Sequence, residues 1–214
     1  MAHDEAPSRR RGRPLNEAQA RRILDAAENA FAEAGYAGMR MQALSDSLGI
    51  NKALPFHYYD SKQGLYDAVI ERIENDLDDA LELGDTGSGS ALDTLHLLVD
   101  RYWTFLEGRP NFARLRQWGY LAGEGHDDAV QRRNKKRLAM FFRIVVEAVD
   151  GDKARAQQGY LSLVGAILFY WINPRAMSMV LGRKHDTKPA LARRREHLHE
   201  LVDALVSGAG HSPK

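Results

Sequence analysis

The chain has 214 residues, of which 44% are hydrophobic and 28% charged, as in an ordinary soluble globular protein. It contains no cysteine, which excludes disulfides, thiolate catalysis and cysteine-ligated metal centres. The N-terminus is charged, and the longest apolar run, residues 159–172, is shorter than the roughly 18 residues of a membrane span. We therefore expect one or two domains in a cytoplasmic protein without a membrane partner.

Charge is distributed unevenly along the chain. Six of the nine lysines and arginines between residues 9 and 62 lie within residues 9–22. Residues 63–100 carry ten acidic side chains and one arginine, whereas residues 153–199 carry nine basic and two acidic ones. A basic N-terminus suits a polyanionic partner, although solvated helix faces are the simpler explanation for such segments.

The predicted elements begin with a disordered basic arm over residues 1–15, which have no apolar periodicity. Helical spacing of apolar residues then predicts a helix from Asn16 to Gly35, a short helix over 41–48 and another over 52–58. Asp60 and Ser61 begin a fourth helix, with Gln63 placed to close a capping box on Asp60.

The rest of the chain also reads as helices separated by turns. After a flexible break at 84–90, we expect helices over about 92–108, 111–122, 127–149 and 152–172, the last stopped by Asn173-Pro174, and a final helix after Lys188-Pro189. No segment has the pattern of a strand. The predicted fold is all-α, with a helix-turn-helix domain at 16–62, a linking helix at 63–83, a regulatory and dimerisation domain at 91–207 and a disordered tail at 208–214.

Residues 41–58 form a helix, a tight turn at Gly49 and a second short helix, which is the helix-turn-helix pattern. Its second helix is too short to contribute much core, and it carries side chains that suit a DNA groove. The basic arm upstream resembles arms that enter a minor groove, through Arg9, Arg10, Arg11 and Arg13.

With these elements in place, residues 13 to about 82 resemble the N-terminal domain of the TetR family of transcriptional regulators. The matching segments are Ile23-Leu24-Asp25-Ala26-Ala27, Phe31-Ala32-Glu33-Ala34-Gly35-Tyr36, Leu44-Ser45, Leu48-Gly49-Ile50-Asn51-Lys52-Ala53-Leu54, His57-Tyr58-Tyr59-Asp60-Ser61-Lys62 and Leu65. Two positions depart from the family. Met39-Arg40 replaces the usual Ser or Thr cap of the second helix, and Pro55-Phe56 replaces Leu-Tyr in the recognition helix, which is then expected to begin late.

The resemblance and side-chain chemistry together assign the DNA contacts. Lys62 is expected to hold a phosphate, Gln42 and Lys52 to read base edges, and Tyr59 to face the core. The complete set of candidates is Arg40, Gln42, Asn51, Lys52, Leu54, His57, Tyr58 and Lys62. The resemblance implies a repressor that binds a palindromic double-stranded operator.

Residues 160–171 are apolar on every side, so we expect this helix to be buried in a homodimer. The alternative is a core helix within a monomer. The expected dimer interface consists of Leu161, Val164, Leu168, Trp171, Leu198, Val202 and Leu205.

Aromatic side chains in the second domain are candidates for a pocket that binds a small-molecule effector. They are Trp103, Phe112, Trp118, Tyr120, Phe141 and Tyr160, although such residues more often form core.

The main alternatives are an enzyme and a helical adaptor that binds another protein through its last helices. His197 and His199 are two apart on a helix and do not share a face. No glycine-rich phosphate loop follows a strand, and we expect no catalytic residue, no cofactor and no metal. The basic arm and helix-turn-helix residues argue against an adaptor.

Overall fold

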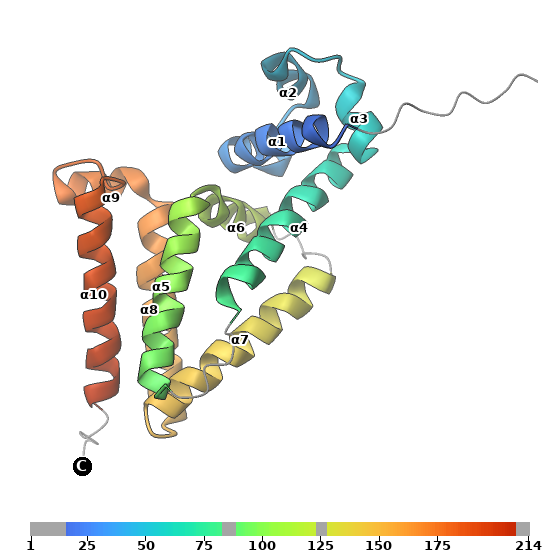
Figure 1. Cartoon of the computed structure of the whole chain (residues 1–214). Coiled ribbons are helices and arrows are strands. Elements are labelled where there is room, and N and C mark those ends of the chain that lie inside the picture. Colours follow the sequence, from blue (N-terminus) through green and yellow to red (C-terminus); the bar gives the residue numbers. More distant parts are fainter. Residues whose placement is uncertain (1–15, 83–88, 123–127, 209–214) are drawn as a thin grey trace, which may run out of the picture.

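A computed structural model describes residues 16–82, 89–122 and 128–208, and in these ranges every regular element is a helix. This confirms the all-α prediction. Figure 1 shows a small N-terminal cluster of three helices, from which α4 runs into a larger helical part. The helices are α1 (Glu17–Gly38), α2 (Met41–Leu48), α3 (Leu54–Tyr59), α4 (Lys62–Leu81), α5 (Ala91–Gly108), α6 (Asn111–Ala122), α7 (Asp128–Ala148), α8 (Lys153–Ile172), α9 (Pro174–Leu181) and α10 (Lys188–Ser207).

Helix α1 begins where the sequence predicts. The side chain of Asn16 accepts hydrogen bonds from the backbone amides of Ala18 and Gln19, which satisfies two of the free N–H groups at the helix start. The regular helix breaks at Gly35, which has φ 68° and ψ 174°, and one further turn follows to Gly38. The predicted end at Gly35 is therefore a break within the helix.

Helix α3 begins at Leu54, two residues later than the sequence spacing alone indicates. Pro55 lies in its first turn, where the missing N–H breaks no intrahelical bond, and Leu54 before it is helical despite the steric preference against it. The Asn51 side chain accepts from the amide of Ala53 at 2.9 Å and so organises the turn ahead of the helix. The helix therefore accommodates the proline in its first turn without breaking.

Helix α4 carries an apolar stripe that joins the two parts of the molecule. Its buried side chains repeat every four residues: Leu65, Val69, Ile73, Leu77 and Leu81. Ser61 caps the helix by accepting from the amide of Gly64 at 2.9 Å. The expected capping box does not form, because Gln63 donates to Asp67 instead of bonding Asp60.

Helices α5, α8 and α10 run side by side in the larger part, with α7 crossing below them in Figure 1. Helix α9 was not predicted: Asn173 ends α8, and Pro174 begins a new helix at an angle of 93° to it. Proline favours a first-turn position, so it starts α9 as well as stopping α8. No single helix among the described residues has the length and apolar character to cross a membrane; only the bent α8–α9 pair passes by length and composition.

A polar cluster joins α5 to α10. Asp100 accepts from Arg195 Nε at 2.6 Å and contacts His199 Nε2 at 2.7 Å. The ring of His199 stacks on that of His96, whose Nε2 contacts Asp203 at 2.9 Å. Partial burial raises the pKa of Asp100, but the bonds from Arg195 and His199 outweigh it, and the pKa lies below its usual range.

We expect Asp100→Asn to lower the free energy of unfolding near neutral pH. A carboxylate whose pKa is depressed by folding stabilises the protein above its unfolded pKa, about 3.9, and that contribution is lost as pH falls through the lower folded value. The difference between wild type and variant, measured by chemical denaturation, should therefore shrink in this acidic range. Asp79→Asn, at an exposed site on α4, is the control. A difference that grew on acidification would contradict the assignment.

Candidate functional site

Five of the predicted DNA contacts are exposed, and α2 and α3 lie on the side of α1 away from the larger part of the chain (Figure 1). These five are Arg40, Gln42, Asn51, Lys52 and His57. The structure thus gathers exposed cationic and amide side chains on one protruding edge. Their contact with DNA remains a prediction.

The other three candidates are half-buried. Leu54 packs against the core. The hydroxyl of Tyr58 accepts from the amide of Asn16 at 3.2 Å, and its own proton remains available to a phosphate. The ammonium of Lys62 lies 4.6 Å from the centre of the Tyr36 ring, a cation–π contact that holds it at the start of α4.

Some groups on this edge already have partners. The Gln42 side chain donates to Asp46 at 2.7 Å, so reading a base requires that this bond be exchanged. Tyr59, expected in the core, donates its hydroxyl to the carbonyl of Ala20 at 2.8 Å, and burial raises its pKa. The neighbouring tyrosines 58 and 59 therefore both connect α3 to the start of α1.

Gly64 is a residue of this site that the sequence did not single out. A Cβ at Gly64 would overlap the backbone carbonyl oxygen of Tyr59, far inside van der Waals contact. The end of α3 and the first turn of α4 can approach this closely only without a side chain. A glycine in the first turn of an otherwise regular helix was the signal available in the sequence.

A buried carboxylate connects the N-terminal cluster to the rest of the chain. Glu28 of α1 is 5% exposed, and its Oε2 lies 2.5 Å from Arg72 Nη2 on α4 and 3.2 Å from Arg109 Nη1 after α5. Arg72 also binds Asp25 at 2.6 Å, and Arg109 binds Asp76. Although burial lowers the pKa of Arg72, the bonds to Asp25 and Glu28 raise it overall. The guanidinium groups compensate the buried charge.

Trp118 of α6 forms the second connection to α1. Its Nε1 donates to the carbonyl of Ala32 at 3.2 Å, and its ring packs on Gly35, where a Cβ would lie 2.9 Å from Trp118 Cδ2. Trp118 thus forms a contact between α6 and α1, and its place in an effector pocket stays a prediction. Trp103 is fully buried in the core, with its ring centre 5.4 Å from that of Tyr170 and 5.3 Å from that of Trp171. The side chain of Tyr120 lies outside the described residues.

Three other predicted pocket residues do surround a cavity of about 310 Å³ between helices α4 to α8. Phe112, Phe141 and Tyr160 contribute to its wall, with further apolar and basic residues that were not predicted. These are Leu77, Leu81, Tyr102, Arg116, Asn134, Lys135, Arg137, Leu138, Met140, Val164, Ile167 and Leu168. The volume lies at the lower end of the roughly 300–1,000 Å³ range of small-molecule pockets.

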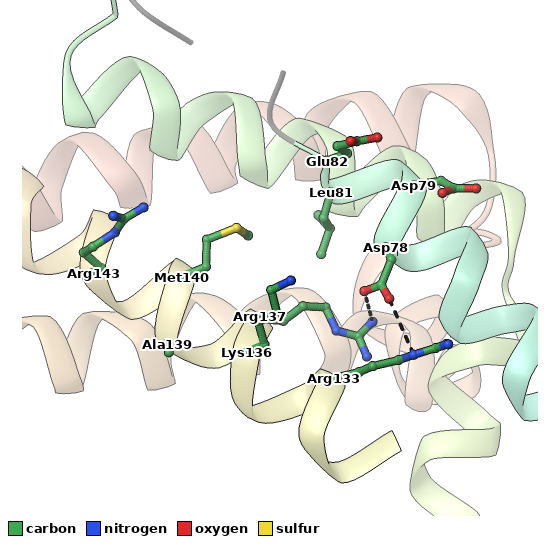
Figure 2. Close-up of a pocket in the computed structure, with 10 residues that line it drawn as sticks. All are labelled: Asp78, Asp79, Leu81, Glu82, Arg133, Lys136, Arg137, Ala139, Met140 and Arg143. Atoms are coloured by element: carbon green, nitrogen blue, oxygen red, sulfur yellow. Dashed lines mark ion pairs between the residues drawn. The ribbon is translucent and has the colours of Figure 1, made fainter. Parts of the chain in front are cut away.

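A larger cleft of about 880 Å³ adjoins this cavity and shares Leu81, Arg137 and Met140 with it. Figure 2 shows acidic side chains of α4 and basic side chains of α7 on its walls. Asp78 Oδ1 lies 3.5 Å from Arg137 Nη1, and Asp78 Oδ2 lies 4.0 Å from Arg133 Nε.

The expected dimer interface is only partly available to a partner. Trp171, Leu198 and Val202 are at most 6% exposed within one chain, because α10 packs its apolar stripe against α5 and α8. This corrects their assignment to an interface between chains. Val164 and Leu168 are half-buried at the cavity, and Leu205 packs on Gly159.

Leu161 does fit an interface, with 62% of its surface exposed. The exposed apolar surface continues at Phe169 on α8 and at Met179 and Val180 on α9, which the sequence did not indicate. Arg9, Arg10, Arg11 and Arg13 lie outside the described residues.

Helices α1, α2 and α3 have the order and the tight turn at Gly49 of a helix-turn-helix domain. Residues 23–69 match the family model described as "Bacterial regulatory proteins, tetR family". This segment, which runs from α1 into α4, is similar to the regulators that the model describes.

Solved structures of the same fold extend over nearly the whole chain. A TetR-like transcriptional regulator from Rhodococcus sp. RHA1 is 20% identical, with TM-score 0.69, over 92% of this chain and 100% of that one. The ketosteroid transcriptional regulator KstR2 of Mycobacterium tuberculosis is 15% identical, with TM-score 0.69, over 91% and 98%. A TetR transcription regulator from Haloarcula marismortui is 20% identical, with TM-score 0.59, over 88% and 98%.

We expect Gly64→Ala to lower DNA affinity by about tenfold or more while costing about 1–3 kcal/mol of stability, because the new methyl group forces α3 away from α4. Fluorescence anisotropy with a labelled duplex measures the first quantity and chemical denaturation the second. Gly108→Ala is the control, since a Cβ there meets nothing within 4 Å. Unchanged DNA affinity in a folded Gly64→Ala protein would show that the α3–α4 contact does not position the recognition helix.

Proposed function

We propose that the protein is a ligand-responsive transcriptional repressor that acts in the cytoplasm and binds a palindromic operator as a homodimer. The observation that carries this proposal is the cationic, amide-rich edge of α2 and α3, positioned by the start of α4. In this proposal Lys52 and Gln42 read base edges, and Lys62 and Tyr58 hold phosphates. The N-terminal arginines, from Arg9 to Arg13, enter the neighbouring minor groove.

A dimer suits this function because two recognition helices can then read half-sites about 34–36 Å apart. The exposed Leu161 and Phe169 lie eight residues apart on α8, which places them on one helix face. An isologous contact through this face would remove both from water in each chain. The chemistry of the surface supports a dimer rather than a helix left exposed to solvent.

The cavity between α4 and α8 is the proposed effector site. Its wall includes Leu77 and Leu81 of α4 and Phe112 of α6, and both of these helices contact α1. An effector that fits only one placement of α4 and α6 would favour one separation of the recognition helices in the dimer. The ion pairs of Glu28 and the packing of Trp118 would carry the displacement to α1.

The proposal is tested by selecting operators from a pool of random duplexes with purified protein at two salt concentrations. We expect enrichment of a palindrome and a steep fall in log affinity with log salt. Sequence-independent binding at both concentrations, or no binding at low salt, would overturn it.

Lys52→Ala and Lys62→Ala should separate base reading from phosphate binding. We expect Lys52→Ala to relax the preference at one base pair, at a cost of about 1–3 kcal/mol on the preferred sequence. Lys62→Ala should weaken binding to all sequences alike and reduce the salt slope by about 1. Affinity titrations over matched and mismatched duplexes measure both effects, and Lys153→Ala, exposed at the start of α8, is the control. Equal losses on every sequence for both variants would contradict the assignment of Lys52.

Phe169→Glu should convert the protein from a dimer to a monomer of about 24.0 kDa, because it places a charge in the apolar contact. Sedimentation equilibrium measures the mass, and Leu97→Glu, at an exposed leucine of α5, controls for the added charge. A wild-type monomer, or a dimer that survives Phe169→Glu, would show that this face of α8 is not the interface.

A further inference from the structure

We propose that the cavity binds a small apolar carboxylate, whose charged group competes with buried Glu74 for Arg116 and Arg137. This inference rests on the proposed function, in which the cavity is the effector site, and it adds the chemical class of the effector and the contact through which it acts.

The wall of the cavity combines an apolar body with a basic end. Aromatic and aliphatic side chains of α4 to α8 form most of the wall. Arg116, Lys135 and Arg137 are its charged residues, and no carboxylate belongs to the wall among the described residues. An apolar molecule with one negative charge satisfies both parts, whereas a neutral ligand leaves the basic end without a partner and a cation is repelled.

Glu74 of α4 lies behind these cations and is 2% exposed. Its Oε1 accepts from Arg116 Nη1 at 3.3 Å, and its Oε2 accepts from Arg137 Nη2. Asn134 Oδ1 accepts from the same two guanidinium groups, at 3.2 and 2.9 Å. A carboxylate that replaces Glu74 therefore finds two arginines already oriented side by side.

Arg137 also has a donor to spare. Its Nη1 is buried and has no hydrogen-bond acceptor among the described residues, and Asp78 Oδ1 lies 3.5 Å from it. Buried guanidinium donors without acceptors are costly, so this atom favours an additional anion. Figure 2 shows Arg137 beside Arg133 on the wall of the adjoining cleft, and Arg137 lines both the cleft and the cavity. The α7 wall of the cleft, with Arg133, Lys136 and Arg143, thus gives the charged end of a ligand a basic approach, opposite the acidic wall.

Competition at Glu74 would act on the helix that enters the DNA-binding domain. Arg72 and Glu74 are two residues apart on α4 and face different neighbours: Arg72 pairs with Glu28 on α1, and Glu74 pairs with α6 and α7. A buried carboxylate that loses its partners is strongly destabilising, so a bound anion favours a position of α4 in which Glu74 reaches water. That movement also alters the Arg72 contact with α1.

The first test compares acids with uncharged analogues on the wild-type protein. Isothermal titration calorimetry with decanoate and 4-phenylbutanoate, below their micellar concentrations, should give saturable binding to at least one of them. The methyl ester of the acid that binds should have an affinity at least about tenfold lower, because the ester cannot form charge-assisted hydrogen bonds with the arginines. Equal affinity for acid and ester, or no binding of either acid, would overturn the proposal.

The second test uses matched variants. Glu74→Gln should bind the acid about tenfold more tightly, because the competing charge is gone, and should bind the ester as wild type does. Glu71→Gln, at an exposed site on the same helix and outside the walls of the cavity and the cleft, should change neither. Arg137→Gln should lose acid binding, whereas Arg132→Gln, at an exposed position of α7 outside the walls of the cavity and the cleft, should retain most of it. Circular dichroism establishes that each variant is folded, and unchanged acid affinity in folded Glu74→Gln would exclude the competition.

A DNA measurement separates this proposal from the proposed function. If wild type binds its selected palindrome but discriminates no acid from its ester, the regulator stands and the ligand class is wrong. If acid binding depends on Arg137 but no palindrome is selected, the cavity assignment stands and the operator proposal fails. If both hold, the acid should change the affinity for the palindrome, and Glu74→Gln should reduce that change.

Discussion

Burial of two carboxylates on opposite sides of α4 constrains the rest of this structure. Glu28 of α1 pairs with an arginine of α4, and Glu74 of α4 pairs with arginines of α6 and α7. Each of the two carboxylates is at most 5% exposed. A buried carboxylate is tolerated only when cations and hydrogen bonds compensate it, and removing one partner typically costs about 3–5 kcal/mol. Both therefore fix the placement of α4 through their arginines. The linking helix is held by directional contacts as well as by its apolar stripe.

These contacts give the two parts of the chain a defined relation. Arg72 and Arg109 meet at Glu28, while Trp118 packs α6 on the break at Gly35 in α1. The cavity shares walls with both α4 and α6. In the proposed function, a change in cavity occupancy would therefore act on two of the helices that support α1. Ion pairs are better suited than apolar packing alone to transmit a displacement from the cavity to α1. Their geometry is specific, so they distinguish sharply between alternative placements of the helices.

Much of the fold could be predicted because it depends on local chemistry. The four-residue apolar period of α4 and the caps at Asn16 and Ser61 follow from spacing and side-chain type. Pro55 is compatible with α3 because it stands in the first turn of that helix. Residues in the second domain were harder to assign, because an aromatic residue at helical spacing suits a core, a helix contact or a cavity equally well. Trp103 lies in the core, Trp118 packs on α1 and Phe112 lines the cavity.

The sequence by itself determined the helical class, the order of the main helices and the helix-turn-helix with its exposed cations, because periodicity, caps and turn residues act within a few positions of the chain. Only the tertiary structure decided which apolar face of the last helices remains exposed, how closely α3 approaches Gly64 and which arginines meet Glu28 and Glu74. The residues in these contacts, apart from Gly64 and its neighbours, lie tens of positions apart. Their pairing depends on how the helices pack, which no local pattern records.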